Sequence, residues 1–170
     1  WWFGSLDAKV AGAVTYPQAQ RLHADNPLPT FFVVDGANEA EHIAKPRMST
    51  GSTIEVELVD SSHEVSSLQF TKWVPSAPMQ AILFDYSIAE SGTYSFEVQL
   101  MTGPSFGKAQ VLIDGKATGE VIDCNSDAVG TSGLIAVGAV RMMARNSHVL
   151  GFRSVDEKAI GIDCYIIKKL

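Results

Sequence analysis

Residues 92–116 read GTYSFEVQLMTGPSFGKAQVLIDGK, and the alternation within this stretch decides the fold class. Apolar side chains alternate with polar ones over the first half, at Tyr94, Phe96, Val98 and Leu100. Successive side chains of a strand point to opposite faces of a sheet, so this pattern predicts a half-buried antiparallel strand. A loop with Gly and Pro at 102–107 and an apolar run at 109–113 predict the second arm of a β-hairpin. The turn pair Asp114-Gly115 ends that arm.

Beyond residue 36 the chain continues in the same manner, with short alternating or apolar runs between turn residues. We expect further strands at 54–58, 82–88, 120–124, 135–142, 148–152 and 159–167. The last run is apolar on both faces, which is typical of a strand in the middle of a sheet. About nine short strands separated by Gly, Pro, Asn and Ser predict an all-β fold, an antiparallel two-sheet sandwich or jelly roll over 36–170.

Residues 1–35 differ from the rest and are expected to form an irregular N-terminal arm or linker. They begin with WWFG and contain Pro17, Pro27 and Pro29. Proline fixes φ and interrupts regular structure. Tryptophans and a phenylalanine make an unusual free terminus, so we expect the chain to be a fragment of a longer protein. The arm is expected to pack against its own domain or against a preceding one.

Composition and charge exclude several classes of protein. The 170 residues carry a formal net charge of −6, and their 13 Lys and Arg residues are scattered along the chain. Binding to nucleic acid or to a membrane surface depends on clustered cations, so neither partner is expected. The sequence also lacks a nucleophile elbow, a phosphate-binding loop, an HExxH motif and a CxxC pair. We therefore expect a protein that is not an enzyme.

The two cysteines, Cys124 and Cys164, each follow an aspartate within an apolar context. Two interpretations stay open. A free cysteine is commonly buried, because its side chain behaves as a small hydrophobic group. A disulfide bond would instead join the two residues if their strands were neighbours and the protein were exported.

Two groups of acidic residues have spacings that permit cation binding. Glu39 and Glu41 are two residues apart, which on a strand places both carboxylates on one face. Such a pair is either exposed at a sheet edge or bridged by a hard cation such as Ca²⁺. Residues 123–127, DCNSD, have the spacing that begins a calcium loop. However, Ala128 and Leu134 replace the glycine and glutamate that the loop needs, so a turn after a strand is expected.

Two aromatic residues fall in segments that the pattern assigns to loops. Trp73 lies in TKWVP, residues 71–75, and Phe106 lies in the loop of the expected hairpin. Sugar rings stack on exposed aromatic rings, while nearby amides and acids bind the sugar hydroxyl groups. The alternative is that either ring folds back over the core, and for Phe106 both interpretations stay open.

From residue 39 to the C-terminus the chain resembles the galactose-binding-like β-sandwiches of the family 6 and family 35 carbohydrate-binding module type. Five landmarks follow in the order found in those modules. They are EAEHI at 39–43, ESGTYSFEVQLMTG at 90–103, FGKAQVLIDGKATGEVID at 106–123, NSHVL at 146–150 and IGIDCYIIKKL at 160–170. The pair at 146–147 departs from the small residue and glycine that many of these modules have. WWFG is similar to the last strand of a preceding jelly-roll domain in some multidomain bacterial glycoside hydrolases.

The resemblance also implies site residues. In such modules the Glu-x-Glu pair and the aspartate of the last strand commonly hold a structural Ca²⁺. The corresponding residues here are Glu39, Glu41 and Asp163. Saccharides are bound by variable loops, and the corresponding candidates here are Trp73, Phe106 and Asn125.

The function that the resemblance implies is that of a non-catalytic carbohydrate-binding module. Such a module binds a poly- or oligosaccharide and holds an attached or partner enzyme, such as a preceding catalytic domain, near that substrate. The resemblance places it in an extracellular or periplasmic location. Two alternatives stay open. One is a structural or assembly domain that packs on a neighbouring domain or chain, and the other is a small jelly-roll enzyme that acts on glycans.

Overall fold

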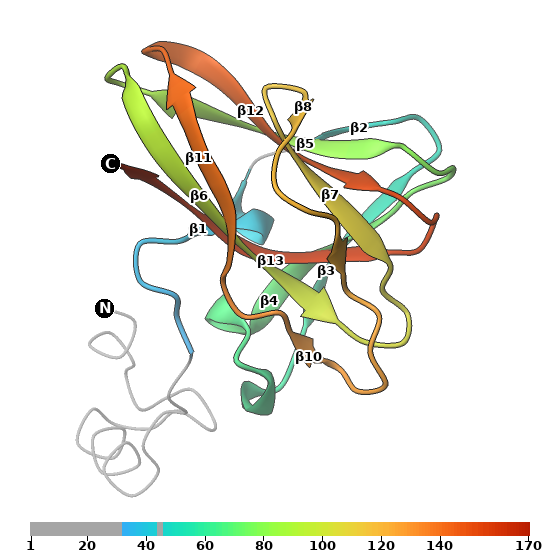
Figure 1. Cartoon of the computed structure of the whole chain (residues 1–170). Helices are drawn as coiled ribbons and strands as arrows, with labels where there is room; N and C mark the ends of the chain where they lie inside the picture. The colour runs from blue at the N-terminus through green and yellow to red at the C-terminus, as the bar shows by residue number, and fades with distance from the viewer. Residues whose placement is uncertain (1–31, 44–45) are drawn as a thin grey trace, which may run out of the picture. The chain divides into compact units, whose positions relative to one another are not determined.

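The computed structural model describes residues 32–43 and 46–170, and strands predominate in that part of the chain (Figure 1). The longer strands are β3 (Thr53–Leu58), β4 (Gln69–Val74), β5 (Ala81–Ile88), β6 (Gly92–Thr102), β7 (Lys108–Ile113), β11 (Ile135–Met142), β12 (Arg145–Ser154) and β13 (Ile160–Lys169). Two-residue strands are β1 (Asn38–Glu39), β2 (Arg47–Met48), β8 (Lys116–Ala117), β9 (Ile122–Asp123) and β10 (Gly130–Thr131). Single turns of 3₁₀-helix are η2 (Ala40–His42), η3 (Ser61–His63) and η4 (Ser66–Leu68). Residues 1–31 lie outside the described part of the chain, and so do the predictions made for that portion of the arm.

The strands form two antiparallel sheets, which confirms the predicted all-β sandwich class. The first sheet has the order β10-β6-β13-β4-β3, with β11 also paired to β6 and β1 to β13. The second has the order β2-β5-β12-β7-β8, with β9 also paired to β7. The apolar run at 159–167 becomes β13, which lies in the middle of its sheet as predicted (Figure 1).

One apolar core lies between the two sheets. Phe84 of the second sheet packs on Tyr165 of the first, with ring centroids 6.4 Å apart. Tyr86 of the second sheet packs on Phe96 of the first at 6.1 Å. Aromatic pairs at such separations add about 0.5–1.5 kcal/mol each beyond the burial of their area. The alternation in β6 therefore does place one face of that strand in the core.

The predicted hairpin between β6 and β7 is wrong. These strands belong to different sheets, so the loop at 103–107 carries the chain across the sandwich. A short loop with Gly and Pro serves either connection, and alternation identifies a buried face but no pairing partner. The turn pair Asp114-Gly115 does close a hairpin, between β7 and β8. Its φ angles of 49° and 78° are those that a two-residue type I′ turn requires.

A β-bulge interrupts β13 near its centre. The register against β6 shifts between Ile162 and Cys164, so Asp163 is an extra residue in the strand. Ile162 and Tyr165 both belong to the core cluster although they are an odd number of residues apart. The bulge thus leaves Asp163 and Cys164 together on the side of the sheet that faces away from the core.

Candidate functional site

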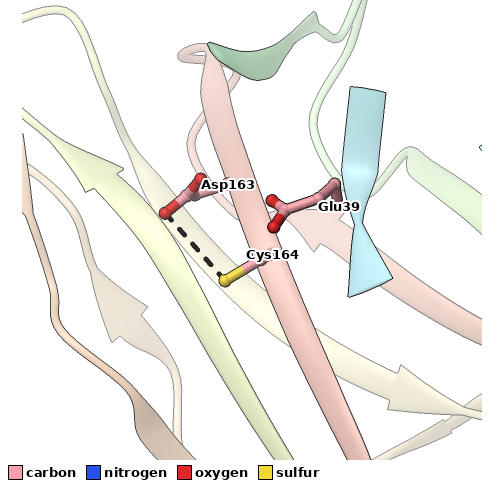
Figure 2. Close-up of side chains that lie close together, drawn as sticks. All are labelled: Glu39, Asp163 and Cys164. Carbon is pink, nitrogen blue, oxygen red and sulfur yellow. Dashed lines mark hydrogen bonds between the residues drawn. The ribbon is translucent and has the colours of Figure 1, made fainter. Parts of the chain in front are cut away.

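Two acidic side chains and a thiol meet on the outer side of the first sheet, beside the bulge. Glu39 ends β1, which pairs with β13 so that Glu39 lies opposite Cys164. Glu41 follows in the turn η2, so the two glutamates are not on one strand. The expectation that a strand would place both carboxylates on one face therefore does not apply to them. Oxygens of Glu39 and Asp163 and the sulfur of Cys164 all lie within 4.8 Å of one another (Figure 2). The charge of Glu41 acts on Asp163 and on Cys164. Of the predicted metal ligands, the structure therefore brings Glu39 and Asp163 together, and Glu41 lies on the turn η2, which packs against β13 and β4.

Two polar residues that the sequence did not single out hold Asp163 in place, one through its backbone and one through its side chain. The backbone N–H of Ser66 donates to both carboxylate oxygens at 3.1 Å, and the Gln99 amide donates to Oδ2 at 2.7 Å. The Ser66 hydroxyl donates to Oε1 of Glu39 at 2.6 Å. Asp163 and Ser66 are completely buried. Gln99 lies on the polar face of β6, as the alternation of that strand predicted. The alternation did not indicate that Gln99 is buried.

The remaining carboxylate oxygens of this cluster lack partners. The side chain of Glu41 is only 2% exposed, yet neither of its oxygens accepts a hydrogen bond, and Oε2 of Glu39 accepts none either. The exposed His42 ring lies 4.0 Å from Oε1 of Glu41. Among the described residues, no Lys or Arg forms an ion pair with any of the three acids. Burying unpaired carboxylates is unfavourable unless a cation or protons neutralise them.

The electrostatics of the cluster are those of an uncompensated site. Burial raises the pKa of Asp163 to about 7, with the hydrogen bonds from Ser66 and Gln99 opposing the rise and the charges of Glu39 and Glu41 adding to it. Burial likewise raises the pKa of Glu41, and the charge of Glu39 adds to this effect. The carboxylate oxygens of Glu39 and Asp163, within 4.8 Å of each other, are ligands of the kind that hard divalent cations bind. These residues therefore fit a metal ion.

The prediction that Trp73 is an exposed loop residue is wrong. Trp73 lies within β4, between β3 and β13, and its side chain is completely buried in the core. The proline that follows at position 75 made the segment resemble a loop, but the strand ends at Val74, just before it. A ring with no exposed face offers no surface on which a sugar stacks.

Phe106 takes the second of its two interpretations. Its ring is 4% exposed and packs edge-on against Phe70, with centroids 6.0 Å apart. The exposed Asn125 donates from its amide to the carbonyl oxygens of Pro104 and Phe106, at 3.4 Å each. Its backbone N–H donates to Asp123 at 3.1 Å, which gives the expected turn. Asn125 thus supports the crossing loop at 103–107.

Both cysteines are buried and neither forms a disulfide bond. Cys124 belongs to the apolar core cluster, whereas Cys164 lies in the cluster of carboxylates. The interpretation of two free, buried cysteines therefore applies.

A cleft of about 480 Å³ is bordered by residues of both sheets, where β5 extends beyond its neighbour β2. Its polar lining comes from Asn38, Asp85, Tyr86, Ser87, Tyr94 and Tyr165. The Tyr86 hydroxyl is buried and has no hydrogen-bond partner. Arg47 holds the carboxylate of Asp85 at 2.7 Å. A second cleft of about 530 Å³, formed by 119–123 and 135–137, has no aromatic residue in its lining.

Comparison with known proteins defines the fold class. No protein-family model matches the sequence, and no curated protein matches it. Among solved structures, a Paenibacillus xanthan lyase matches 84% of this chain with a TM-score of 0.68 and 16% identity, and the chain spans 14% of that enzyme. The xylan-binding domain CBM22-1 from Paenibacillus barcinonensis matches with a TM-score of 0.57 and 10% identity, over 78% of this chain and 92% of that domain. The family 35 carbohydrate-binding module from Clostridium thermocellum matches with a TM-score of 0.53 and 18% identity, over 79% and 99%.

The chain therefore has the β-sandwich fold of carbohydrate-binding modules. This confirms the predicted resemblance at the level of the fold. A Podospora anserina mannanase, GH26-CBM35, contains the same fold within a longer chain, of which this chain spans 27%.

Proposed function

We propose that this chain is a non-catalytic carbohydrate-binding domain that holds an attached enzyme near polysaccharide. The observation that carries the proposal is the match to two binding modules over 92% and 99% of their lengths. The xanthan lyase and the mannanase support the attachment, because in both of them the matching segment is one part of a longer chain.

The cleft beside β5 is the proposed position of the sugar. Sugar hydroxyl groups need donors and acceptors, and sugar C–H faces need an apolar or aromatic wall. The carboxylate of Asp85, the hydroxyl of Ser87 and the amide of Asn38 supply the first, and the half-buried ring of Tyr86 supplies the second. These residues replace Trp73 and Phe106, whose rings are buried.

A divalent cation held by Glu39, Glu41 and Asp163 is the proposed cofactor, and Ca²⁺ is the ion that the resemblance implies. Its chemistry would be to neutralise three buried negative charges. The three residues lie on β1, η2 and β13, so a shared ion would fasten β1 and η2 to β13. The unpartnered oxygens of Glu39 and Glu41 support this proposal.

Affinity electrophoresis on gels that contain xylan, mannan, galactan or xanthan tests the binding function. We expect at least one polysaccharide to retard the domain. Replacing Asp85 by Asn keeps the shape of this exposed side chain and removes its charge, so Asp85→Asn weakens binding by about 2- to 10-fold, the value of one hydrogen bond. Glu120→Gln in the second cleft is the matched control and leaves retardation unchanged.

Uniform absence of retardation by a wide panel of polysaccharides would contradict the proposal. It would favour the alternative of a packing domain, for which the edge strand β3 offers an apolar surface. On that strand the side chains of Val56 and Leu58 are 53% and 77% exposed. Release of reducing sugar from any of the polysaccharides would instead favour a glycan-active enzyme.

A further inference from the structure

A thiol shares the pocket of the three carboxylates. The sulfur of Cys164 lies 4.0 Å from Oδ2 of Asp163 and within 4.8 Å of an oxygen of Glu39. Figure 2 shows these side chains together where β13 passes β1. Ligand atoms bound to one zinc ion at about 2.0–2.3 Å lie about 3–4 Å apart. Small rotations of the side chains would therefore place all of them around a single ion.

Cys164 does not serve the apolar core. Its neighbours Ile162 and Tyr165 belong to the core cluster, and so does the other cysteine, Cys124, but Cys164 does not. The bulge at Asp163 turns it to the outer side of the sheet, where it lies beside the carboxylates of Glu39 and Asp163. A buried cysteine that packs as a small hydrophobic group is found among apolar side chains. A carboxylate pocket is the wrong surrounding for that role and a suitable one for a metal ligand.

Unpartnered carboxylate oxygens of Glu39 and Glu41 are a separate observation that supports a ligand here. The side chain of Glu41 is 2% exposed, and neither of its carboxylate oxygens has a hydrogen-bond partner. Ser66 and Gln99 fix the orientation of Asp163 from outside the cluster. Such outer hydrogen bonds are a common feature of metal sites, because they orient the ligands.

We propose that Cys164 is a sulfur ligand of the cation that Glu39, Glu41 and Asp163 hold, so that the site binds Zn²⁺ more tightly than Ca²⁺. The inference rests on the cation site of the proposed function. Ca²⁺ takes oxygen ligands, whereas a thiolate selects softer ions. On binding, the S–H bond breaks, its electron pair forms the bond from sulfur to the ion, and the proton passes to solvent.

Cadmium is a suitable probe, because a bond from Cd²⁺ to a thiolate gives an ultraviolet charge-transfer band. The chain is freed of metal with a chelator, and Cd²⁺, Zn²⁺ and Ca²⁺ are titrated separately by calorimetry and by competition with a metal-binding dye. We expect the band on addition of Cd²⁺, and a lower dissociation constant for Zn²⁺ than for Ca²⁺. Cys124→Ser, the matched control, removes a buried thiol from the core and keeps the band.

Cys164→Ser is expected to abolish the band and to weaken Zn²⁺ binding by about tenfold or more, while Ca²⁺ binding changes little. If that variant does not fold, Cys164→Ala replaces it, and the band of the Cys124→Ser protein remains decisive. Ca²⁺ binding without a cadmium band, or with Ca²⁺ the tighter ion, would overturn the inference and leave the cation site intact. If none of the three ions binds, both the sulfur ligand and the cation site are overturned. Retardation by polysaccharide reports separately on the sugar-binding function.

Discussion

At the scale of single residues, Asp163 makes the stability of the domain depend on pH and on dissolved cations. The residue is completely buried, its hydrogen bonds come from Ser66 and Gln99, and no cationic side chain of the described chain pairs with it. Its ionised form is therefore less favourable in the folded domain than in water unless something else supplies positive charge.

This arrangement predicts a pH dependence of stability in the presence of a chelator. Folding raises the pKa of Asp163 from 3.8 to about 7, so between these values the folded state binds more protons than the unfolded state. The free energy of unfolding therefore falls as pH rises through this window. Urea unfolding is expected to give a lower midpoint at about pH 8 than at about pH 5. The substitution Asp163→Asn is expected to make the urea midpoint less dependent on pH. A wild-type midpoint that rises from about pH 5 to about pH 8 would contradict the prediction.

Individual residues also show where sequence reasoning reached its limit. Glu39 and Asp163 were predicted as partners and do lie close together. The prediction was possible because the order of landmarks identified the segments that carry them. Trp73 was assigned to the wrong environment, because a proline after a short strand has the same appearance as a loop. Ser66 gave no signal at all, since its role depends on the path of the chain between η3 and β4.

At the scale of elements, β13 bears the largest share of the constraints. It pairs with β6, β4 and β1, places its apolar side chains in the core and carries the bulge. The sequence predicted its central position from an apolar run on both faces. Its partners were not predictable, because period-two alternation gives the face of a strand and leaves its neighbours undetermined. The same limit made the crossing from β6 to β7 look like a hairpin.

Close packing of β13 predicts that Gly161→Ala destabilises the domain. A Cβ at this position would lie 2.5 Å from Cβ of Met101 and 2.9 Å from the ring of Phe106. Overpacking of this kind costs about 1–3 kcal/mol in the free energy of unfolding, which urea denaturation measures. Gly92→Ala is the matched control on β6, because the nearest atom to its Cβ is the flexible end of Lys169 at 3.0 Å. Equal stability of the two variants would contradict the packing argument.

At the scale of the whole molecule, the two sheets share one core, and the candidate cation site lies outside it. The core cluster contains residues from both sheets, whereas Glu39, Asp163 and Cys164 lie together on the outer side of one. Neutralising the three carboxylates therefore adds to the stability of a sandwich that already has an apolar interior. Removing the ion should lower the melting temperature without unfolding the domain.

We expect a saturating divalent cation to raise Tm and a chelator to reverse the change. A ligand that binds only the folded state at 100 times its Kd adds about 2.7 kcal/mol. For a domain of this size that corresponds to about 5–10 °C in Tm, measured by calorimetry. The double variant with Glu39→Gln and Glu41→Gln is the control and is expected to show no response to the ion. A wild-type Tm that is the same with cation and with chelator would contradict the site.

The bulge in β13 has a consequence for how such a site is gained or lost. Ile160 and Ile162 precede the extra residue and Tyr165 and Ile167 follow it, all four in or against the core. Deleting Asp163 alone would restore strict alternation through these positions, and it would remove a carboxylate at the same time. One codon therefore separates a sandwich that carries this buried carboxylate from one that has the same interior and lacks it, so the two forms are adjacent steps in evolution or in design.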